Sequence, residues 1–186
     1  MDAMKLSSFV LAFIMVLPVA VKAQPAPPPT ANDIMKNAFV QAGNEHKNVF
    51  VMFHASWCGW CHKMDKSMND EVCKKFFDDN FVICHLVVDE SADKKNLENP
   101  GADEMRNKYY GANQGIPFWL VFDKDWNLLA DSKMRAEGQG AESGQNIGCP
   151  AAANEVDYFI SILKKTSKLN SSQLEIIRKR FRENEQ

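Results

Sequence analysis

The sequence predicts an α/β fold in which helices flank a mixed central sheet. The run from Val49 to Phe53 is apolar at every position, which is typical of a strand covered on both faces. Apolar residues then recur every four positions, which is typical of a helix: Met64, Met68, Val72 and Phe76. A second apolar run follows at residues 81–88. The two runs are therefore predicted to be parallel strands joined by a right-handed helical crossover.

A helix is expected before the first strand. It covers residues 32–46, and Thr30 or Asn32 can cap its start. Its predicted buried face consists of the apolar residues that share one side: Ile34, Met35, Ala38, Phe39 and Ala42. The first strand then covers residues 48–54, and the helix that follows it is expected to continue to residue 79.

A polar loop and a hairpin are expected after the second strand. Residues 89–101 form a surface loop whose charges are expected to be solvated. A short helix over residues 102–110 ends at Gly111, because glycine favours helix termination. Residues 117–122 and 127–130 then form a hairpin of two strands.

Residues 131–148 are rich in glycine and polar side chains, which predicts a mobile loop. Pro150 is well placed as the first residue of a following helix. The apolar face of that helix consists of Val156, Phe159, Ile160 and Leu163. A last helix over residues 171–185 has Leu174, Ile177 and Phe181 on its inner face. Its basic residues, expected to be a solvated face rather than a partner site, are Arg178, Lys179, Arg180 and Arg182.

Two cysteines lie where the first strand meets the next helix, in the stretch Trp57-Cys58-Gly59-Trp60-Cys61. The first turn of a helix has unpaired N–H groups and a partial positive charge, which favour a thiolate at Cys58. The two intervening residues bring the sulfur of Cys61 within disulfide reach. We therefore expect these two cysteines to be chemically reactive.

This stretch resembles the active site of the thioredoxin superfamily. Downstream, Gly115-Ile116-Pro117 opens another apolar run and is similar to the cis-proline loop that faces the cysteines in that superfamily. The resemblance covers roughly residues 32–166 and implies a thioredoxin-like fold. Since a proline-rich segment replaces the usual strand before the first helix, we expect a reduced, four-stranded mixed sheet. The helix in residues 167–186 is then an extra C-terminal extension.

The resemblance also implies a function, which is thiol–disulfide exchange with no metal or organic cofactor. Cys58 is the expected nucleophile, and Cys61 is the expected resolving thiol that attacks the mixed disulfide. The expected substrate-binding residues are Trp57, Gly59, Trp60, Ile116 and Pro117. A cis peptide is expected before Pro117, the alternative being a trans proline at the head of a strand. The residues between the cysteines do not fix the direction of electron flow.

One position departs from the superfamily pattern. Thioredoxins commonly have a buried aspartate six residues before the first cysteine, where it helps to take the proton of the resolving thiol. Met52 stands there in this chain. His54 or His62 could accept that proton instead, although a histidine that is exposed or satisfied in the core is the simpler interpretation.

Other chemistries compete for the same residues. Cys58, Cys61 and His62 match C-x-x-C-H, the attachment motif of c-type haem. A haem protein, however, requires neither the apolar strand before the motif nor the proline loop after it. Zinc could use these three residues with His54, but four ligands packed so locally seldom form a tetrahedron. A permanent structural disulfide, or a redox-inactive binding module with the same fold, is a further alternative.

The start of the chain predicts export. Lys5 precedes an apolar run from Phe9 to Leu17, and a small-residue site ends at Ala23, so residues 1–23 read as a cleaved signal peptide. Residues 24–31 are then a proline-rich tether. We expect a periplasmic or secreted protein with no stable membrane span after cleavage. Its expected partners are exported proteins with cysteine thiols or disulfides, and an unidentified partner that recycles the dithiol.

The remaining composition adds two expectations. The net charge of −2 gives no electrostatic reason to expect nucleic acid as a partner. Cys73 and Cys84 lie on a predicted helix and strand, so both are expected to be buried free thiols. Cys149 is expected either to be covered or to take part in a bridge, since an exposed free thiol is a liability in an oxidising compartment.

Overall fold

The computed structural model describes residues 26–185. The predicted signal peptide lies outside these residues. Residues 26–30 form neither helix nor strand, and the carbonyl of Pro29 accepts a hydrogen bond from Asn99. Among the residues that the structure describes, no helix is both long and apolar enough to cross a lipid bilayer.

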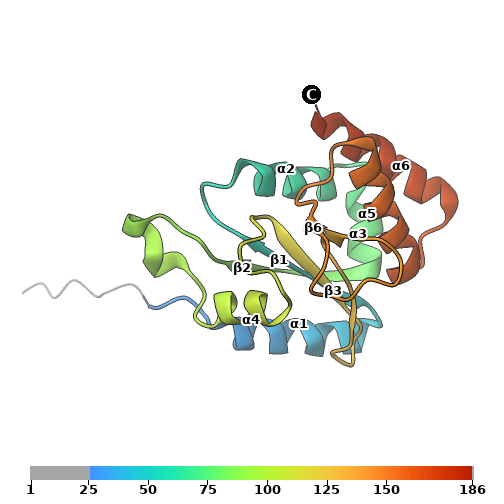
Figure 1. Ribbon diagram of the computed structural model, residues 1–186. Coiled ribbons are helices and arrows are strands. Elements are labelled where there is room, and N and C mark those ends of the chain that lie inside the picture. Colours follow the sequence, from blue (N-terminus) through green and yellow to red (C-terminus); the bar gives the residue numbers. More distant parts are fainter. Residues whose placement is uncertain (1–25, 186) are drawn as a thin grey trace, which may run out of the picture.

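The central sheet has four strands in the order β2-β1-β3-β4, which confirms the expected mixed sheet (Figure 1). These strands are β1 (Asn48–His54), β2 (Phe81–Val87), β3 (Phe118–Phe122) and β4 (Leu128–Asp131). β1 is parallel to β2 and antiparallel to β3. Its five central residues are at most 1% exposed, because helices cover both faces of the sheet as the unbroken apolar run predicts.

Helices form a layer on each face of the sheet (Figure 1). One layer consists of α1 (Ala31–Glu45) and α4 (Ala102–Lys108). The other layer consists of α2 (Gly59–Met68), α3 (Lys74–Asn80), α5 (Ala153–Thr166) and α6 (Ser171–Arg182). The short elements are the 3₁₀ helices η1 (Ala92–Leu97) and η2 (Glu183–Glu185), and a two-stranded sheet of β5 (Lys133–Met134) and β6 (Gln145–Asn146).

Each face of the sheet has its own core. Alternate side chains of β1 enter the two cores, as strand geometry requires: Phe50 and Met52 face α2 and α5, whereas Val51 faces α1. Thr30 caps α1 by accepting a hydrogen bond from the backbone N–H of Asp33, at 3.1 Å.

The long helix expected after the cysteines is interrupted, so that part of the prediction is wrong. α2 ends at Met68, and a turn precedes α3. Asp70 forms this turn, because its carboxylate accepts from the backbone N–H of Val72 and its carbonyl accepts from that of Cys73. Val72 is consequently 49% exposed, although its spacing had placed it on the buried face.

Residues 131–152 also differ from the expectation. The predicted loop contains the β5–β6 pair, and Lys133 within it is fully buried. The next helix begins at Ala153 rather than at Pro150. Its first turn is capped by Glu155, whose carboxylate accepts from the backbone N–H groups of Ala151 and Ala152, both at 3.0 Å.

The basic residues of α6 are largely paired within the chain. Arg180 is only 9% exposed and donates to Asp70 at 2.7 Å, which ties α6 to the turn between α2 and α3. Arg178 pairs with Asp157 on α5, which follows the same pattern. A fully solvated basic face was therefore the wrong expectation for Arg180.

Candidate active site

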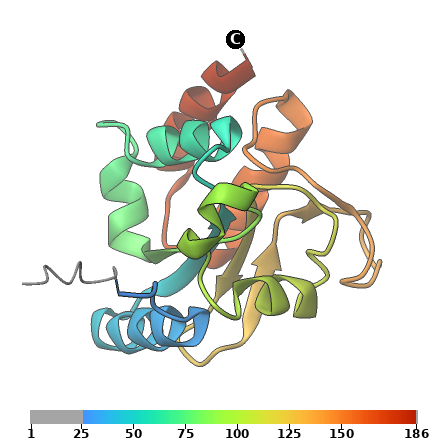
Figure 2. The ribbon, with the colours of Figure 1, turned by 90° about the vertical axis from the view of Figure 1, so that its left-hand side faces the viewer.

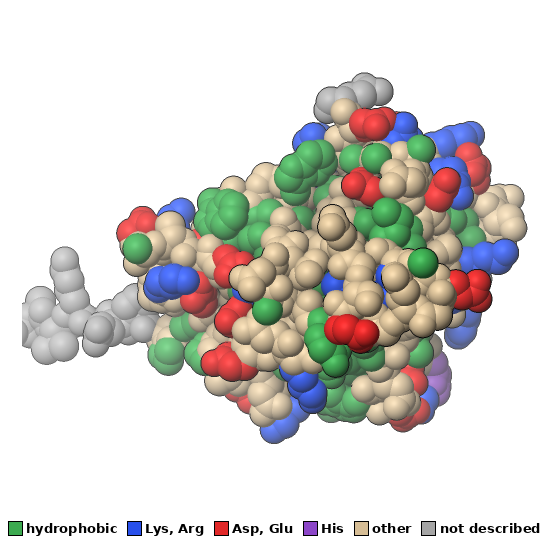
Figure 3. Space-filling view, in the orientation of Figure 1, with side chains coloured by type: hydrophobic (Ala, Val, Ile, Leu, Met, Phe, Trp, Pro, Cys, Tyr) green, Lys and Arg blue, Asp and Glu red, His purple; other side chains and the backbone are tan. Residues whose placement is uncertain are grey.

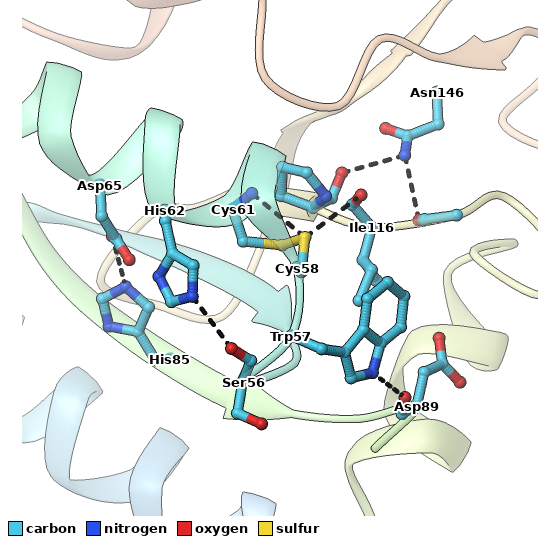
Figure 4. Close-up of a disulfide and its surroundings, with 12 residues drawn as sticks. Ser56, Trp57, Cys58, Cys61, His62, Asp65, His85, Asp89, Ile116 and Asn146 are labelled. Carbon is cyan, nitrogen blue, oxygen red and sulfur yellow. Dashed lines mark hydrogen bonds and ion pairs between the residues drawn. A yellow bond between two sulfur atoms is a disulfide. The ribbon is translucent and has the colours of Figure 1, made fainter. Parts of the chain in front are cut away.

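Cys58 and Cys61 form a disulfide at the start of α2 (Figure 4). Cys58 is the N-cap residue of this helix, and its sulfur accepts the backbone N–H of Cys61 at 3.1 Å. Cys58 is 3% exposed and Cys61 is completely buried. A partner must therefore reach Cys58 through a small opening.

The proline loop lies directly opposite the disulfide. The carbonyl oxygen of Ile116 is 3.6 Å from the sulfur of Cys58, and the Ile116–Pro117 peptide bond is cis. Ile116 also packs against both cysteines in a small apolar cluster. The structure thus brings together four of the predicted site residues, Cys58, Cys61, Ile116 and Pro117.

The two tryptophans of the motif are exposed. Trp57 is 57% exposed and Trp60 is 47% exposed. Hydrophobic side chains are accordingly visible on the surface over α2 and the loop before it (Figure 3). Gly59 leaves open space at the start of the helix, since a Cβ there would meet nothing within 4 Å. The role of Trp57, Gly59 and Trp60 in substrate binding stays a prediction.

A groove of about 390 Å³ lies beside the proline loop. Its lining includes Trp60, Ile116, Pro117, Ile147 and Ala151. Ile147 and Ala151 belong to the segment before α5. The groove is therefore formed jointly by the proline loop and by the segment that leads into α5, of which only the part up to residue 148 was predicted to be a loop.

Asn146 organises this groove, and sequence reasoning missed it. Its side-chain amide donates to the backbone carbonyls of Gln114, Gly115 and Pro117, at 3.0 to 3.1 Å. Figure 4 shows this amide next to the loop that contains Ile116. Its side-chain oxygen accepts from the backbone N–H of Gly148 at 3.0 Å. One amide thus fixes the carbonyls around Ile116. A lone asparagine in a glycine-rich segment has no spacing signal that could have revealed this.

A second set of contacts holds the loop before Cys58. Ser56 donates to Glu90 through its backbone N–H at 2.5 Å and through its hydroxyl at 2.8 Å. The indole N–H of Trp57 donates to the carbonyl of Asp89 at 2.8 Å (Figure 4). Asp89 has a left-handed backbone, with φ of 54°, and its carboxylate is bound by Arg106. Glu90 is only 4% exposed, so the prediction that the charges of this segment are solvated is wrong for Glu90.

The histidines near the disulfide have other partners. The Nε2 atom of His62 lies 3.0 Å from the carbonyl of Ser56, to which it can donate, and His85 pairs with Asp65 at 2.9 Å (Figure 4). Burial lowers the pKa of His54, and the neighbouring His85 lowers it further. Within the described residues, no hydrogen bond joins His54 or His62 to Cys61. Met52 lies in the core at 1% exposure.

No three His, Cys, Asp or Glu side chains within residues 26–185 are arranged to hold a metal ion. The other three cysteines are free and buried. This arrangement fits the expectation for Cys73 and Cys84. Of the two alternatives for Cys149, the structure shows the covered free thiol rather than a disulfide bridge.

Alkylation should therefore single out Cys58. Burial raises the pKa of Cys73 to about 11 and the pKa of Cys84 and Cys149 to about 12, so these thiols are scarcely ionised at neutral pH. In the reduced, folded protein at pH 7, Cys58 should react with iodoacetamide far faster than the other three, with an apparent pKa below 8. Peptide mass mapping after short exposures measures this order. Earlier labelling of Cys73, Cys84 or Cys149 would show that the site is wrongly assigned.

The chain is similar to known proteins in sequence and in structure. A family model described as thioredoxin-like matches residues 31–126. An uncharacterized protein of Caenorhabditis elegans is 32% identical over 85 residues, which are 45% of this chain and 11% of that protein. The chain thus matches only a small part of the length of this curated relative.

Solved structures show similar but distant chains. A disulphide isomerase from Xylella fastidiosa is 22% identical, with a TM-score of 0.46, over 60% of this chain and 80% of that chain. A DsbH oxidoreductase is 19% identical, with a TM-score of 0.41, over 80% of this chain and 95% of that chain.

Proposed function

The chain belongs to the thioredoxin-like family, and from this premise we propose that it exchanges disulfides with cysteines of exported proteins through a mixed disulfide at Cys58. The fold and the Cys58–Cys61 pair support thiol–disulfide oxidoreductase activity in general. The observation that carries the proposal is the position of this pair, at a helix start and against the cis-proline loop. Exported substrates are the finer part of the proposal, and the signal-like sequence of residues 1–23 supports it.

In the reducing direction, the Cys58 thiolate attacks one sulfur of a substrate disulfide. A Cys58–substrate disulfide forms, and the other substrate sulfur leaves as a thiolate that takes up a proton. Cys61 then loses its proton and attacks Cys58, which restores the Cys58–Cys61 disulfide and releases the second substrate thiolate. The substrate gains two electrons and the protein loses two. In the oxidising direction the same steps run backwards.

The local structure supports this assignment of roles. Cys58 receives the backbone N–H of Cys61 and lies at the positive end of the α2 dipole, and both stabilise a thiolate. Such a helix-end interaction is worth about 1 kcal/mol, which lowers a thiol pKa by a little under one unit. Cys61 lies within the first turn and is fully buried, so only the sulfur of Cys58 is within reach of a partner.

Asn146 should contribute by fixing the carbonyls beside Ile116. We expect Asn146→Ala to lower kcat/KM on a protein disulfide about ten- to hundredfold, because the loop that aligns the substrate loses its anchor. Alkylation of Cys58 should be unchanged, since Asn146 does not touch the sulfur. Asn154→Ala, an exposed asparagine on α5, is the matched control. Equal kcat/KM for the two variants would show that the anchor is dispensable.

A redox titration against glutathione tests the proposed function. The mature protein should reach an equilibrium between the dithiol and the disulfide, and its potential decides between reduction and oxidation of substrates. An unidentified partner must then recycle Cys58 and Cys61. The same experiment tests a second candidate, a binding module with a permanent disulfide, which the 3% exposure of Cys58 favours. A disulfide that does not exchange with glutathione in the folded state would support that module and reject the enzyme.

Covalent haem attachment is a poorer fit to the site. It would consume both cysteines as thioethers, whereas here they bond to each other and His62 contacts the carbonyl of Ser56. The thioredoxin-like family match covers this same region. Disulfide exchange is therefore the function that we propose.

A further inference from the structure

Glu90 is a buried carboxylate that the exchange steps above do not use. It lies just after β2, is 4% exposed, and both of its oxygens accept hydrogen bonds from Ser56. Its own backbone N–H donates to Glu98 at 2.8 Å. Figures 1 and 2 show that the segment after β2 lies beside the loop that leads into α2. A buried negative charge is costly unless it is hydrogen-bonded, and Ser56 supplies the two bonds.

Ser56 belongs to the turn that carries the nucleophile. The carbonyl of Ala55 accepts from the backbone N–H of Cys58 at 3.1 Å, which closes a turn with Ser56 and Trp57 at its centre. Glu90 accepts hydrogen bonds from Ser56 in this turn, and the carbonyl of Asp89 accepts one from the indole N–H of Trp57. The position of the Cys58 sulfur therefore depends on a carboxylate that is 34 residues away in the sequence from Ser56.

We propose that Glu90 is a positioning residue of the active site, whose carboxylate holds the Cys58 turn and whose negative charge opposes ionisation of the Cys58 thiol. The proposal rests on the function proposed above. Glu90 is a buried carboxylate bound to the turn that carries Cys58, in a chain that has Met52 at the usual position of a buried aspartate. The carboxylate comes from a different strand end, and it acts through Ser56 rather than on Cys61.

Most other charged groups around the turn interact with a partner of their own. Asp89 is bound by Arg106, Glu98 pairs with Lys95, and Lys63 lies over the ring of Trp60. The remaining groups are the imidazoles of His54 and His62 and the ion pair of His85 with Asp65. The charges of Asp65 and Glu90 oppose the lowering of the His54 pKa that burial causes. Glu90 differs from the acidic residues in this set, because only neutral donors bind its carboxylate.

The Glu90→Gln variant separates the effect of the negative charge from the effect of the two hydrogen bonds. A glutamine can keep both bonds, since its oxygen accepts from the Ser56 backbone while its amide donates to the hydroxyl. Only the negative charge is lost, so the pKa of Cys58 should fall by about one unit. At pH 6 the rate of alkylation should then rise about threefold, because tenfold more thiolate is partly offset by its lower nucleophilicity.

The measurement is the pH dependence of Cys58 alkylation in the reduced protein, mapped by peptide mass, with the melting temperature recorded for each variant. Ser56→Ala is the companion variant. This variant keeps the negative charge of Glu90 but removes the Ser56 hydroxyl that stabilises it by a hydrogen bond. The Cys58 pKa should therefore rise by a few tenths of a unit. Opposite signs in the two variants are expected, whereas a purely structural contact predicts no shift in Glu90→Gln.

An unchanged or raised pKa in folded Glu90→Gln would overturn the inference. If that variant does not fold, a lowered or unchanged pKa in Ser56→Ala would overturn it instead. These results leave the proposed function intact as long as Cys58 remains the most reactive thiol. Loss of that preference in the unmodified protein would reject the proposed function itself.

Discussion

Cys58→Ser should reduce thiol–disulfide exchange to the rate of the uncatalysed reaction, the largest effect that we expect from any single change. The thiolate is the attacking group, and a serine hydroxyl cannot replace it at neutral pH. The substitution removes one sulfur atom at the cap of α2 and leaves an oxygen that can still accept the N–H of Cys61. Activity should therefore disappear without loss of the fold, and reduction of a protein disulfide measures this.

Substitution of the second cysteine should block the reaction at a later step. In Cys61→Ser the resolving attack is lost while Cys58 can still engage a substrate, so mixed disulfides with exported proteins should accumulate. Cys58→Ser should trap few or none. Non-reducing gels of the two variants, expressed in the same host, compare them directly. Equal trapping by both would contradict the separate roles of nucleophile and resolving thiol.

The parts of this site that lie close together in the sequence could be predicted, and the parts brought together by tertiary contacts could not. Cys58 and Cys61 share one helix turn, so their spacing alone indicates a pair. Ile116 was accessible only through the resemblance of its motif. Glu90 and Asn146 act through bonds to residues about 30 positions away, and no local pattern records such a contact.

The same distinction explains the errors in the fold. The unbroken apolar run of β1 predicted its bounds correctly, because burial on both faces depends on composition alone. The interruption between α2 and α3 depends instead on Asp70, which bonds locally to Val72 and across the molecule to Arg180. A helical spacing of apolar residues could not reveal that competing turn. Residues 131–148 were similarly misleading, since their glycines predict a loop while Lys133 and Asn146 pack into the structure.

The largest expected effect on stability lies in α6, which the sequence indicated to be an extension. Phe181 on this helix is fully buried and packs against Phe159 and Phe77, with ring centroids 4.9 and 6.3 Å away. These rings belong to the same core that lies behind α2. The helix therefore contributes to the support of the active-site face rather than standing apart from it.

Phe181→Ala should lower the free energy of unfolding by about 3–5 kcal/mol, since it removes a fully buried ring and leaves a cavity among aromatic neighbours. Urea denaturation followed by circular dichroism measures the loss. Ile176→Ala is the matched control on the same helix, because Ile176 is 39% exposed and its truncation should change stability by less than about 0.5 kcal/mol. Similar losses for the two variants would mean that α6 is a loosely attached extension. A large loss for Phe181→Ala alone would show that the thioredoxin-like fold of this chain depends on its last helix.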